Sequence, residues 1–473
     1  MTVEEIALIQ SKHNAAIIAP AGHGKTEMIT DLVANLPGKK LVLTHTNAGV
    51  SALTQRLSKK QIGKEKYTLS TISSFCMKWC GAYPTTAEVD QTIPLSDNRY
   101  YNDQVCGAVK IFSHSWAREI IKATYACVIV DEYQDCVVNQ HQIFLELNKT
   151  VPVYVFGDPL QSIFGWAGKP VSWNQIEFEL VCVKTSPHRW ERGSVELGQY
   201  LTKVRTVLLP SLDRKRVRLS TIPNGTFIKR ISPASARGTG LLNEMNKYKS
   251  ALYLTKWQQA QCLFSQQTGG VFQNDEPQNL NELYKYAKFL DVDDGYARAE
   301  TIYSFVEACA TQVNAELGSY RKHIIEGDFN FDHIKKHTEF GNRMLNVFQN
   351  HSYNDMLSVL EWVRSNSIFR LYRRELFTEL IRAIQYARDR GTSIHEAAQQ
   401  IRMNPNNQSR YAGFKKLSSR AVLSKGLEFE CVAINLQENY TATEMYVAMT
   451  RAMKTIIFIT DQDSVLLDIP EGV

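Results

Sequence analysis

The stretch from Asn14 to Asp31, NAAIIAPAGHGKTEMITD, decides the fold. Ala15 to Ile18 is a short apolar run typical of a buried parallel strand, Ala19 to Gly24 is small and glycine-bearing, and helical spacing resumes at Lys25. A strand, a glycine-bearing loop and a helix in this order predict a phosphate-binding loop. The residues expected to surround a nucleotide are Ala19, Pro20, Ala21, Gly22, His23, Gly24, Lys25 and Thr26.

Each part of this loop has a chemical task. Gly22 and Gly24 let backbone N–H groups converge on an anion, and the helix N-terminus adds its positive dipole end. Lys25 is expected to reach the β- and γ-phosphates of ATP, and the Thr26 hydroxyl to bind Mg²⁺. Ala19 stands where the general pattern has its first Gly, so a chance strand-to-helix turn is the alternative until downstream residues are considered.

Length and composition bound the class of protein. At 473 residues the chain is too long for one core, and two to four domains are expected. With 44% hydrophobic and 22% charged residues, it has the composition of an ordinary globular protein. The formal net charge of +6 permits a polyanion partner without requiring one.

Cysteine usage and the N-terminus point to the cytoplasm. The nine cysteines form no CxxC pair and lack a His partner at finger spacing; three of them, Cys127, Cys182 and Cys431, lie inside apolar strand-like runs. We therefore expect mostly reduced packing residues. The first ten residues, MTVEEIALIQ, have no basic n-region, and no window has the apolar length that a membrane span requires. Neither a signal peptide nor a membrane partner is expected.

The first part of the chain alternates strand and helix patterns. Further strands are expected at 40–44, 127–130 and 151–156, with a helix from near residue 48 and a strand and helix within 67–78. The pattern loosens over 80–125, which we interpret as a small insertion. The later strands end on acidic residues, at the edge where parallel sheets bind ligands.

The second part is mainly helical. A basic run at 214–218 is interpreted as a solvated strand edge rather than a phosphate track, and 252–264 as a strand and helix. Residues 269–410 carry helical spacing, and the polar tract 403–416 is interpreted as a linker. The expected helices are 280–290, 297–318, 333–348, 354–364 and 371–388, and strands are expected to return at 421–423, 431–435 and 454–460.

Acidic and amide side chains follow two of the predicted strands. In CVIVDEYQD a buried strand delivers Asp131 to hold Mg²⁺ and Glu132 to orient or deprotonate water, although adjacent carboxylates are also common in surface turns. In FGDPLQSIFGWAG, Gln161 is placed to sense a γ-phosphate. Phe164 and Trp166 offer faces for stacking of unpaired bases, with plain core packing as the alternative.

Five motifs in order resemble those of the UvrD/Rep-like branch of superfamily 1 helicases. They are GHGKT (22–26), VDEYQD (130–135), GDPLQSIFGWAG (157–168), KGLEF (425–429) and YVAMTRA (446–452), with weaker matches at LTHTN (43–47), TLSTISSF (68–75) and PHRW (187–190). The resemblance covers the chain to about residue 190 and again from about 417. It implies an α/β fold with two RecA-like parallel-sheet motor domains, a small insertion in the first and a helical insertion in the second.

The resemblance also implies residue roles and domain boundaries. Gln161 would couple the γ-phosphate to DNA, Glu428 would contact the nucleotide sugar, and Arg189 and Arg451 would reach the γ-phosphate from the second motor. Thr46 would join Phe164 and Trp166 on the nucleic-acid path. The implied parts are the first motor at 1–79 and 126–188, its insertion at 80–125, the second motor at 189–268 and 413–473, and the helical insertion at 269–412.

Departures from the family lie on the nucleic-acid side. Where relatives place aromatic or His residues along the DNA path, this chain has His45, Ile72, Ser73, His188 and Val422. Both insertions are short for the family.

Two functions from different classes follow. The first is an ATP-dependent, Mg²⁺-requiring helicase or translocase moving 3′ to 5′ on single-stranded DNA or at a single/double-strand junction. The second is a nucleotide-gated regulatory subunit of a nuclease or anti-phage complex, with little unwinding of its own. A P-loop kinase would leave KGLEF and TRA unexplained.

Overall fold

The computed structural model describes residues 1–90, 93, 98–163, 170–173, 176–220, 222–276, 281–403 and 414–470. The chain divides into two compact units, Met1–Tyr248 with Ser424–Val473, and Lys249–Leu423. No helix in the described ranges is both long enough and apolar enough to cross a membrane.

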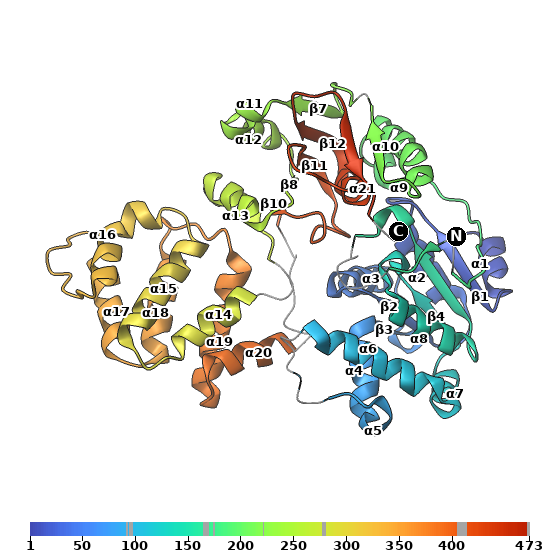
Figure 1. Ribbon diagram of the computed structural model, residues 1–473, viewed down its shortest axis with the longest axis horizontal. Coiled ribbons are helices and arrows are strands. Elements are labelled where there is room, and N and C mark those ends of the chain that lie inside the picture. The colour runs from blue at the N-terminus through green and yellow to red at the C-terminus, as the bar shows by residue number, and fades with distance from the viewer. Residues whose placement is uncertain are drawn as a thin grey trace. The chain divides into compact units, whose positions relative to one another are not determined.

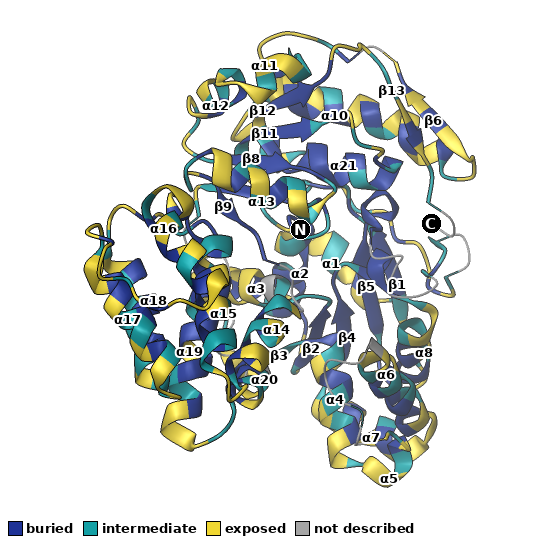
Figure 2. Cartoon of the chain, turned by 60° about the vertical axis from the view of Figure 1, so that its left-hand side comes forward, coloured by how far each residue is buried: buried dark blue, intermediate teal, exposed yellow. Residues whose placement is uncertain are grey.

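The first unit contains a parallel sheet of five strands in the order β1-β5-β4-β2-β3 (Figure 1). Every residue of β2, β4 and β5 is buried, as expected for a parallel sheet covered on both faces. Figure 2 shows these strands in the colour of buried residues. The strands are β1 (Asn14–Ile18), β2 (Lys40–Thr44), β3 (Tyr67–Thr71), β4 (Cys127–Val130) and β5 (Val153–Gly157).

Side-chain alternation along these strands builds a core on each face. Ala15 and Ile17 of β1 join one cluster with α1, α2 and α3, whereas Ala16 between them joins another with α4, α6, α7 and α8. The sheet is therefore sandwiched between helices, which leaves its carboxyl edge free for a site. The helices are α1 (Val3–Gln10), α2 (Lys25–Asn35), α3 (Asn47–Lys59), α4 (Ile72–Ala82), α5 (Pro84–Ala87), α6 (Asn98–Ser113), α7 (Ser115–Thr124) and α8 (Val138–Asn148).

Apart from two short 3₁₀ turns, the rest of the first unit follows the first sheet in sequence. Strands β7, β12 and β11 are parallel, with β12 in the middle, and β6 pairs antiparallel with β13. The basic run at 214–218 leads into and through β6, as expected. The elements are α9 (His188–Glu191), α10 (Val195–Leu208), β6 (Arg216–Leu219), β7 (Ile228–Ile231), α11 (Pro233–Arg237), α12 (Gly240–Met245), β11 (Phe429–Asn435), α21 (Ala442–Thr450), β12 (Ala452–Ile459) and β13 (Val465–Asp468), with short 3₁₀ turns η1 (Lys64–Lys66), η2 (Tyr133–Asp135), η3 (Pro159–Gln161) and η6 (Leu209–Ser211).

The second unit joins three parallel strands to a bundle of helices. Strand β10 lies between β8 and β9, and a single hydrophobic cluster runs through the helices from α14 to α20, drawn in yellow and orange in Figure 1. The elements are β8 (Ala251–Leu254), α13 (Gln258–Gln267), β9 (Gln273–Asn274), α14 (Asn281–Leu290), α15 (Gly295–Cys309), α16 (Val313–Glu326), α17 (Thr338–Gln349), α18 (Tyr353–Ser365), α19 (Arg374–Arg390), α20 (Ile394–Met403) and β10 (Lys416–Ser419).

The fold class is confirmed as α/β with two parallel sheets. Beside the five-stranded sheet, the parallel strands are β7, β12 and β11 in the first unit, and β8, β10 and β9 in the second. The chain therefore has the two parallel sheets expected of two RecA-like domains.

Three local expectations are wrong. The strand expected at 421–423 is a turn, and the strand is β10, whose serines are buried because Ser418 Oγ donates to Gln261 O at 3.0 Å. The helix expected over 297–318 is two helices, because Thr311 N–H turns to Arg370 O at 3.0 Å and Gln312 has a φ of 66°. Cys182 is exposed, whereas six of the nine free cysteines are buried.

Candidate active site

The phosphate loop joins β1 to α2. Ala19 N–H donates to Gly157 O of β5 at 3.0 Å, which fixes the start of the loop against the neighbouring strand. Gly22 and Gly24 have φ values of 72° and 83°, in the left-handed region that glycine adopts without a Cβ penalty. The sequence requirement for glycine at these two positions is therefore a backbone requirement.

The donor set at this loop fits a triphosphate with Mg²⁺. Gly24 is the N-cap of α2 and supplies no side-chain cap, so the first N–H groups of the helix remain for an anion. Lys25 and Thr26 are the first two helical residues. No group of three or more His, Cys, Asp or Glu side chains able to hold a metal occurs in the described part of the chain. Mg²⁺ is commonly held by one or two carboxylates together with substrate phosphates, and Thr26 and Asp131 would be its protein ligands here.

Lys25 lies beside both carboxylates that follow β4. Its Nζ is 2.6 Å from Glu132 Oε1 and 3.4 Å from Asp131 Oδ1. Burial opposes the charged ammonium, but the two carboxylates outweigh it and raise the pKa of Lys25. Burial raises the pKa of Asp131. The structure thus brings the predicted phosphate ligand, metal ligand and catalytic base together.

Glu132 sits in a constrained conformation. Its φ of 56° is unusual for a residue with a side chain, and such backbone strain costs about 1–3 kcal/mol and clusters at functional sites. Besides Lys25, its carboxylate lies 3.4 Å from Lys425 Nζ and accepts from Gln134 Nε2. Burial alone would raise the pKa of Glu132, but the two lysines hold it well below its ordinary value.

Gln161 and Asp158 follow β5 at the same sheet edge. Gln161 Nε2 donates to Asp158 Oδ2 at 2.9 Å, and the same oxygen accepts from Ala21 N–H at 3.1 Å. Lys425 Nζ donates to Gln161 O at 2.8 Å. The residue predicted to sense the γ-phosphate is therefore connected through one carboxylate to the phosphate loop.

Arg189, Glu428 and Arg451 lie within the same unit as the loop. Arg189 N–H donates to Gly22 O at 3.2 Å, and its guanidinium pairs with Glu428 at 2.8 Å and donates to Thr450 O. Arg451 is 2% exposed and donates to Gln161 Oε1 at 3.4 Å. Burial, assisted by the neighbouring Arg189, lowers the pKa of Arg451 to about 9. All six predicted catalytic residues thus belong to one contact network; their individual roles stay predictions.

For the residues predicted to contact nucleic acid, the structure describes only Thr46. Thr46 caps α3, its hydroxyl accepting from Gly49 N–H at 3.0 Å, and Phe164 and Trp166 lie outside the described residues. Of the departures noted along the DNA path, Ile72 is 1% exposed in the core and His45 Nε2 lies 3.4 Å from Cys136 Sγ, whereas His188 is exposed. Ile72 therefore offers no stacking surface.

The lowered pKa of His45 predicts a measurable pH dependence of stability. Burial, with the nearby Lys425 charge, lowers the pKa of His45 from 6.5 to about 3. Between these values the unfolded chain binds more protons at this group, so its contribution to the free energy of unfolding falls as pH is lowered, by up to about 1.4 kcal/mol per pH unit. His45→Gln removes this contribution. Urea unfolding at pH 7, 6 and 5 should show a stability difference between wild type and variant that changes with pH; a constant difference would contradict the assignment.

Sequence reasoning missed several residues that complete the site. Lys425 and Asp135 stand inside quoted motifs without an assigned role, yet Lys425 pairs with Asp135, whose pKa is raised to about 6 by burial. Trp190 packs against Gly22, where a Cβ would lie 2.9 Å from the indole. Arg205 pairs with Asp158 at 2.6 Å, and no sequence motif contains it.

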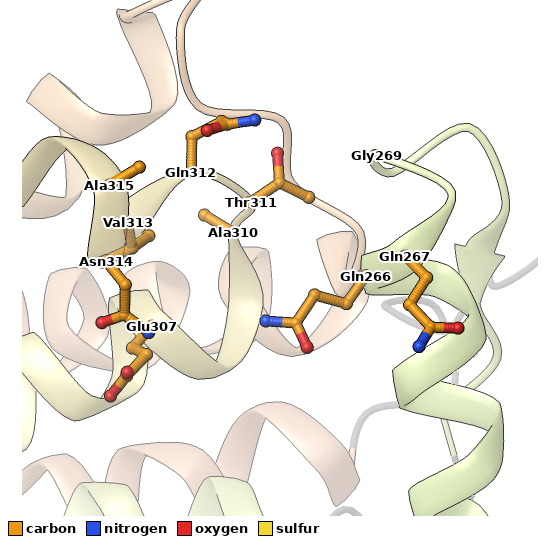
Figure 3. A pocket seen from close by; sticks show the side chains of 10 residues that line it. All are labelled: Gln266, Gln267, Gly269, Glu307, Ala310, Thr311, Gln312, Val313, Asn314 and Ala315. Atoms are coloured by element: carbon orange, nitrogen blue, oxygen red, sulfur yellow. The ribbon is translucent and has the colours of Figure 1, made fainter.

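A cavity of about 320 Å³ lies in the second unit (Figure 3). Glu307, Thr311, Gln312 and Asn314 line it together with Gln266 and Gln267. None of the predicted site residues contributes to it. The cavity is accordingly no part of the candidate active site.

Comparison with known proteins agrees with this geometry. The UvrD/REP helicase N-terminal domain family matches residues 2–100 and 98–173, about a third of the chain. A segment of 56 residues is 41% identical to the RecBCD enzyme subunit RecB of Buchnera aphidicola subsp. Schizaphis graminum (strain Sg), and covers 11% of this chain. It spans only 5% of that relative's length. These matches support a helicase-family role, and the resemblance of this chain to the UvrD-like superfamily 1 helicases is confirmed.

Proposed function

We propose that the chain is an ATP-dependent DNA helicase or translocase that couples ATP hydrolysis to 3′ to 5′ movement on single-stranded DNA. The observation that carries the proposal is the network in which Lys25, Glu132 and Gln161 meet Arg189 and Arg451, which come from elements far downstream in the sequence. A phosphate site completed by arginines from a later part of the chain suits hydrolysis coupled to closure.

Each residue has a place in this proposal. ATP would supply the phosphoryl group, and Mg²⁺ would neutralise the charge that develops on it. Lys25, Thr26 and Asp131 would hold ATP and Mg²⁺. The Lys25 ammonium pairs with Glu132 in this structure. If Lys25 binds a phosphate of ATP instead, Glu132 would be free to accept a proton from water. Arg189 and Arg451 would stabilise charge at the γ-phosphate, an effect typically worth about 10³ to 10⁵ in rate. Glu428, 2.8 Å from Arg189, would contact the nucleotide sugar.

We also propose the division into two motors that the motifs imply. The first motor would comprise 1–79 and 126–188, and the second 189–268 and 413–473, with insertions at 80–125 and 269–412. The helices from α14 to α20 fall inside the last range. Movement along a strand would then follow from closure and opening of the two motors.

Trp166 provides a test of the nucleic-acid path. Base stacking on an aromatic ring is worth about 1–3 kcal/mol, so Trp166→Ala should weaken single-stranded DNA binding by roughly 5- to 150-fold. Hydrolysis without DNA should change little. Fluorescence anisotropy with a labelled oligonucleotide measures the affinity. An unchanged affinity would show that Trp166 does not stack on bases and would favour core packing.

The second candidate is a nucleotide-gated regulatory subunit that controls a nuclease or another effector. Two observations favour it: Ile72, where relatives place residues of the DNA path, packs in the core, and the matched relative is a subunit of the RecBCD enzyme. A cytoplasmic location suits both candidates, since each acts on or beside DNA.

Strand displacement by the purified chain separates the two candidates. The substrates are duplexes with a 3′ tail, a 5′ tail or a fork, and Lys25→Ala gives the background. Displacement that needs ATP and a 3′ tail supports the helicase. ATP hydrolysis without displacement on any substrate supports the regulatory subunit, whereas displacement that needs a 5′ tail contradicts the proposed polarity.

A further inference from the structure

Asp158 is the point at which three parts of the chain meet. Its carboxylate is fully buried at the end of β5. Oδ2 accepts from Ala21 N–H at 3.1 Å and from Gln161 Nε2 at 2.9 Å, and Oδ1 accepts from Arg205 Nη1 at 2.6 Å and from Leu160 N–H at 3.3 Å. The phosphate loop and the γ-phosphate sensor therefore share one oxygen, and Arg205 holds the other.

Arg205 reaches this carboxylate from α10. The helix buries Leu201, Val204 and Leu208 on its packed face, and Arg205 borders that face with only 12% of its side chain exposed. Its Nη1 also donates to the Tyr446 hydroxyl at 3.4 Å, and the guanidinium lies 5.8 Å from the Tyr446 ring centroid. Tyr446 belongs to α21, the helix whose C-cap is Arg451. Arg205 thus connects Asp158 both to α10 and to the helix that leads into Arg451.

We propose that Arg205 is a positioning residue for ATP hydrolysis, which acts through Asp158 to hold the phosphate loop and Gln161 in place. The inference rests on the proposed function. A buried carboxylate without a counter-charge is costly, and it would relax toward water or a new donor. Such relaxation would shift Ala21 and Gln161 together, because both donate to the same oxygen. The phosphate loop would then be ordered only when α10 is packed so that Arg205 reaches Asp158. Nucleotide affinity would therefore depend on the position of this helix.

Arg205→Met tests the inference, with Lys203→Met on the exposed side of the same helix as the matched control. Arg205→Met should reduce kcat/KM for ATP roughly tenfold or more, within the range of coupling between contacting residues. Because Gln161 is the predicted γ-phosphate sensor, affinity for a non-hydrolysable ATP analogue should fall more than affinity for ADP. Lys203→Met should leave both unchanged.

A double-mutant cycle separates positioning from simple packing. In an Asp158→Asn background, Arg205→Met should lower kcat/KM by roughly threefold or less, because Arg205 can no longer act through the Asp158 carboxylate. If Arg205 only stabilised the fold, Arg205→Met would instead lower the thermal midpoint and leave the ratio of ATP-analogue to ADP affinity unchanged. If Arg205→Met does not fold, Arg205→Gln replaces it, with the same expected loss.

The outcomes distinguish the inference from the proposed function. A folded Arg205 variant with the kcat/KM and affinity ratio of Lys203→Met overturns the inference while ATP hydrolysis by the wild type stands. A wild-type chain that neither binds nor hydrolyses ATP overturns the proposed function itself. Equal losses from Arg205→Met in the wild-type and Asp158→Asn backgrounds show that Arg205 does not act through Asp158, which also overturns the inference.

Discussion

Replacing Lys25 by alanine should reduce ATP hydrolysis by about 10²- to 10³-fold or more, the range seen when one donor to developing charge is removed. Lys25 is the first residue of α2 and lies 2.6 Å from Glu132 and 3.4 Å from Asp131. Its loss removes the only ammonium that the phosphate loop itself contributes. Steady-state release of inorganic phosphate measures the effect, and thermal unfolding shows whether the variant is folded.

Lys12→Ala is the matched control for this experiment. Lys12 lies just before β1 in the same unit, with about a third of its side chain exposed, and pairs with Glu179 at 2.6 Å. An exposed pair of this kind contributes little to stability, so this variant should hydrolyse ATP at the wild-type rate. DNA-stimulated turnover by a folded Lys25→Ala variant would exclude the phosphate-loop assignment.

Replacing Glu132 by glutamine should lower kcat by about 10²- to 10⁴-fold, the usual contribution of a positioned general base. The amide keeps the size of the side chain but cannot accept the proton. Binding of ATP should persist, because the change removes a carboxylate that competes with phosphate for Lys25. Single-turnover hydrolysis and nucleotide affinity, measured on the same preparation, separate the two effects.

Glu146→Gln provides the comparison for Glu132→Gln. Glu146 is 7% exposed on α8, and its carboxylate pairs with Lys149 at 2.7 Å and Arg118 at 3.3 Å. The change therefore removes another lysine-paired carboxylate of low exposure, but away from the sheet edge. Stability should fall while kcat for ATP stays near the wild-type value. If Glu132→Gln behaves in the same way, Glu132 is a structural residue and another group is the base.

Local patterns in the sequence predicted the first sheet well, and they named residues that the structure places together at its edge. Strand β2 was expected at its observed bounds, and the glycine, lysine and carboxylate positions all lie at one sheet edge. The reason is that these elements carry their own signals: continuous apolar runs for buried parallel strands and glycine where φ is positive.

Other features depend on contacts that no local pattern encodes. Strand β10 is a polar KLSS segment, buried because its serines find partners, whereas the apolar AVL that follows it forms a turn. The break before α16 arises from pairing with residues near 370. Arg205 meets Asp158 across 47 residues of sequence, and only the fold places it there. Sequence reasoning named the residues that meet at the sheet edge but not those, such as Arg205, that connect them to downstream elements.

The most direct measurement is ATP hydrolysis by the purified chain with and without single-stranded DNA, beside duplex DNA and RNA, with Lys25→Ala as background. We expect hydrolysis above that background and a severalfold increase with single-stranded DNA, because Arg189 and Arg451, which would complete the site, come from elements proposed to move along the strand. Hydrolysis no faster than the Lys25→Ala background under any of these conditions would contradict the proposed function.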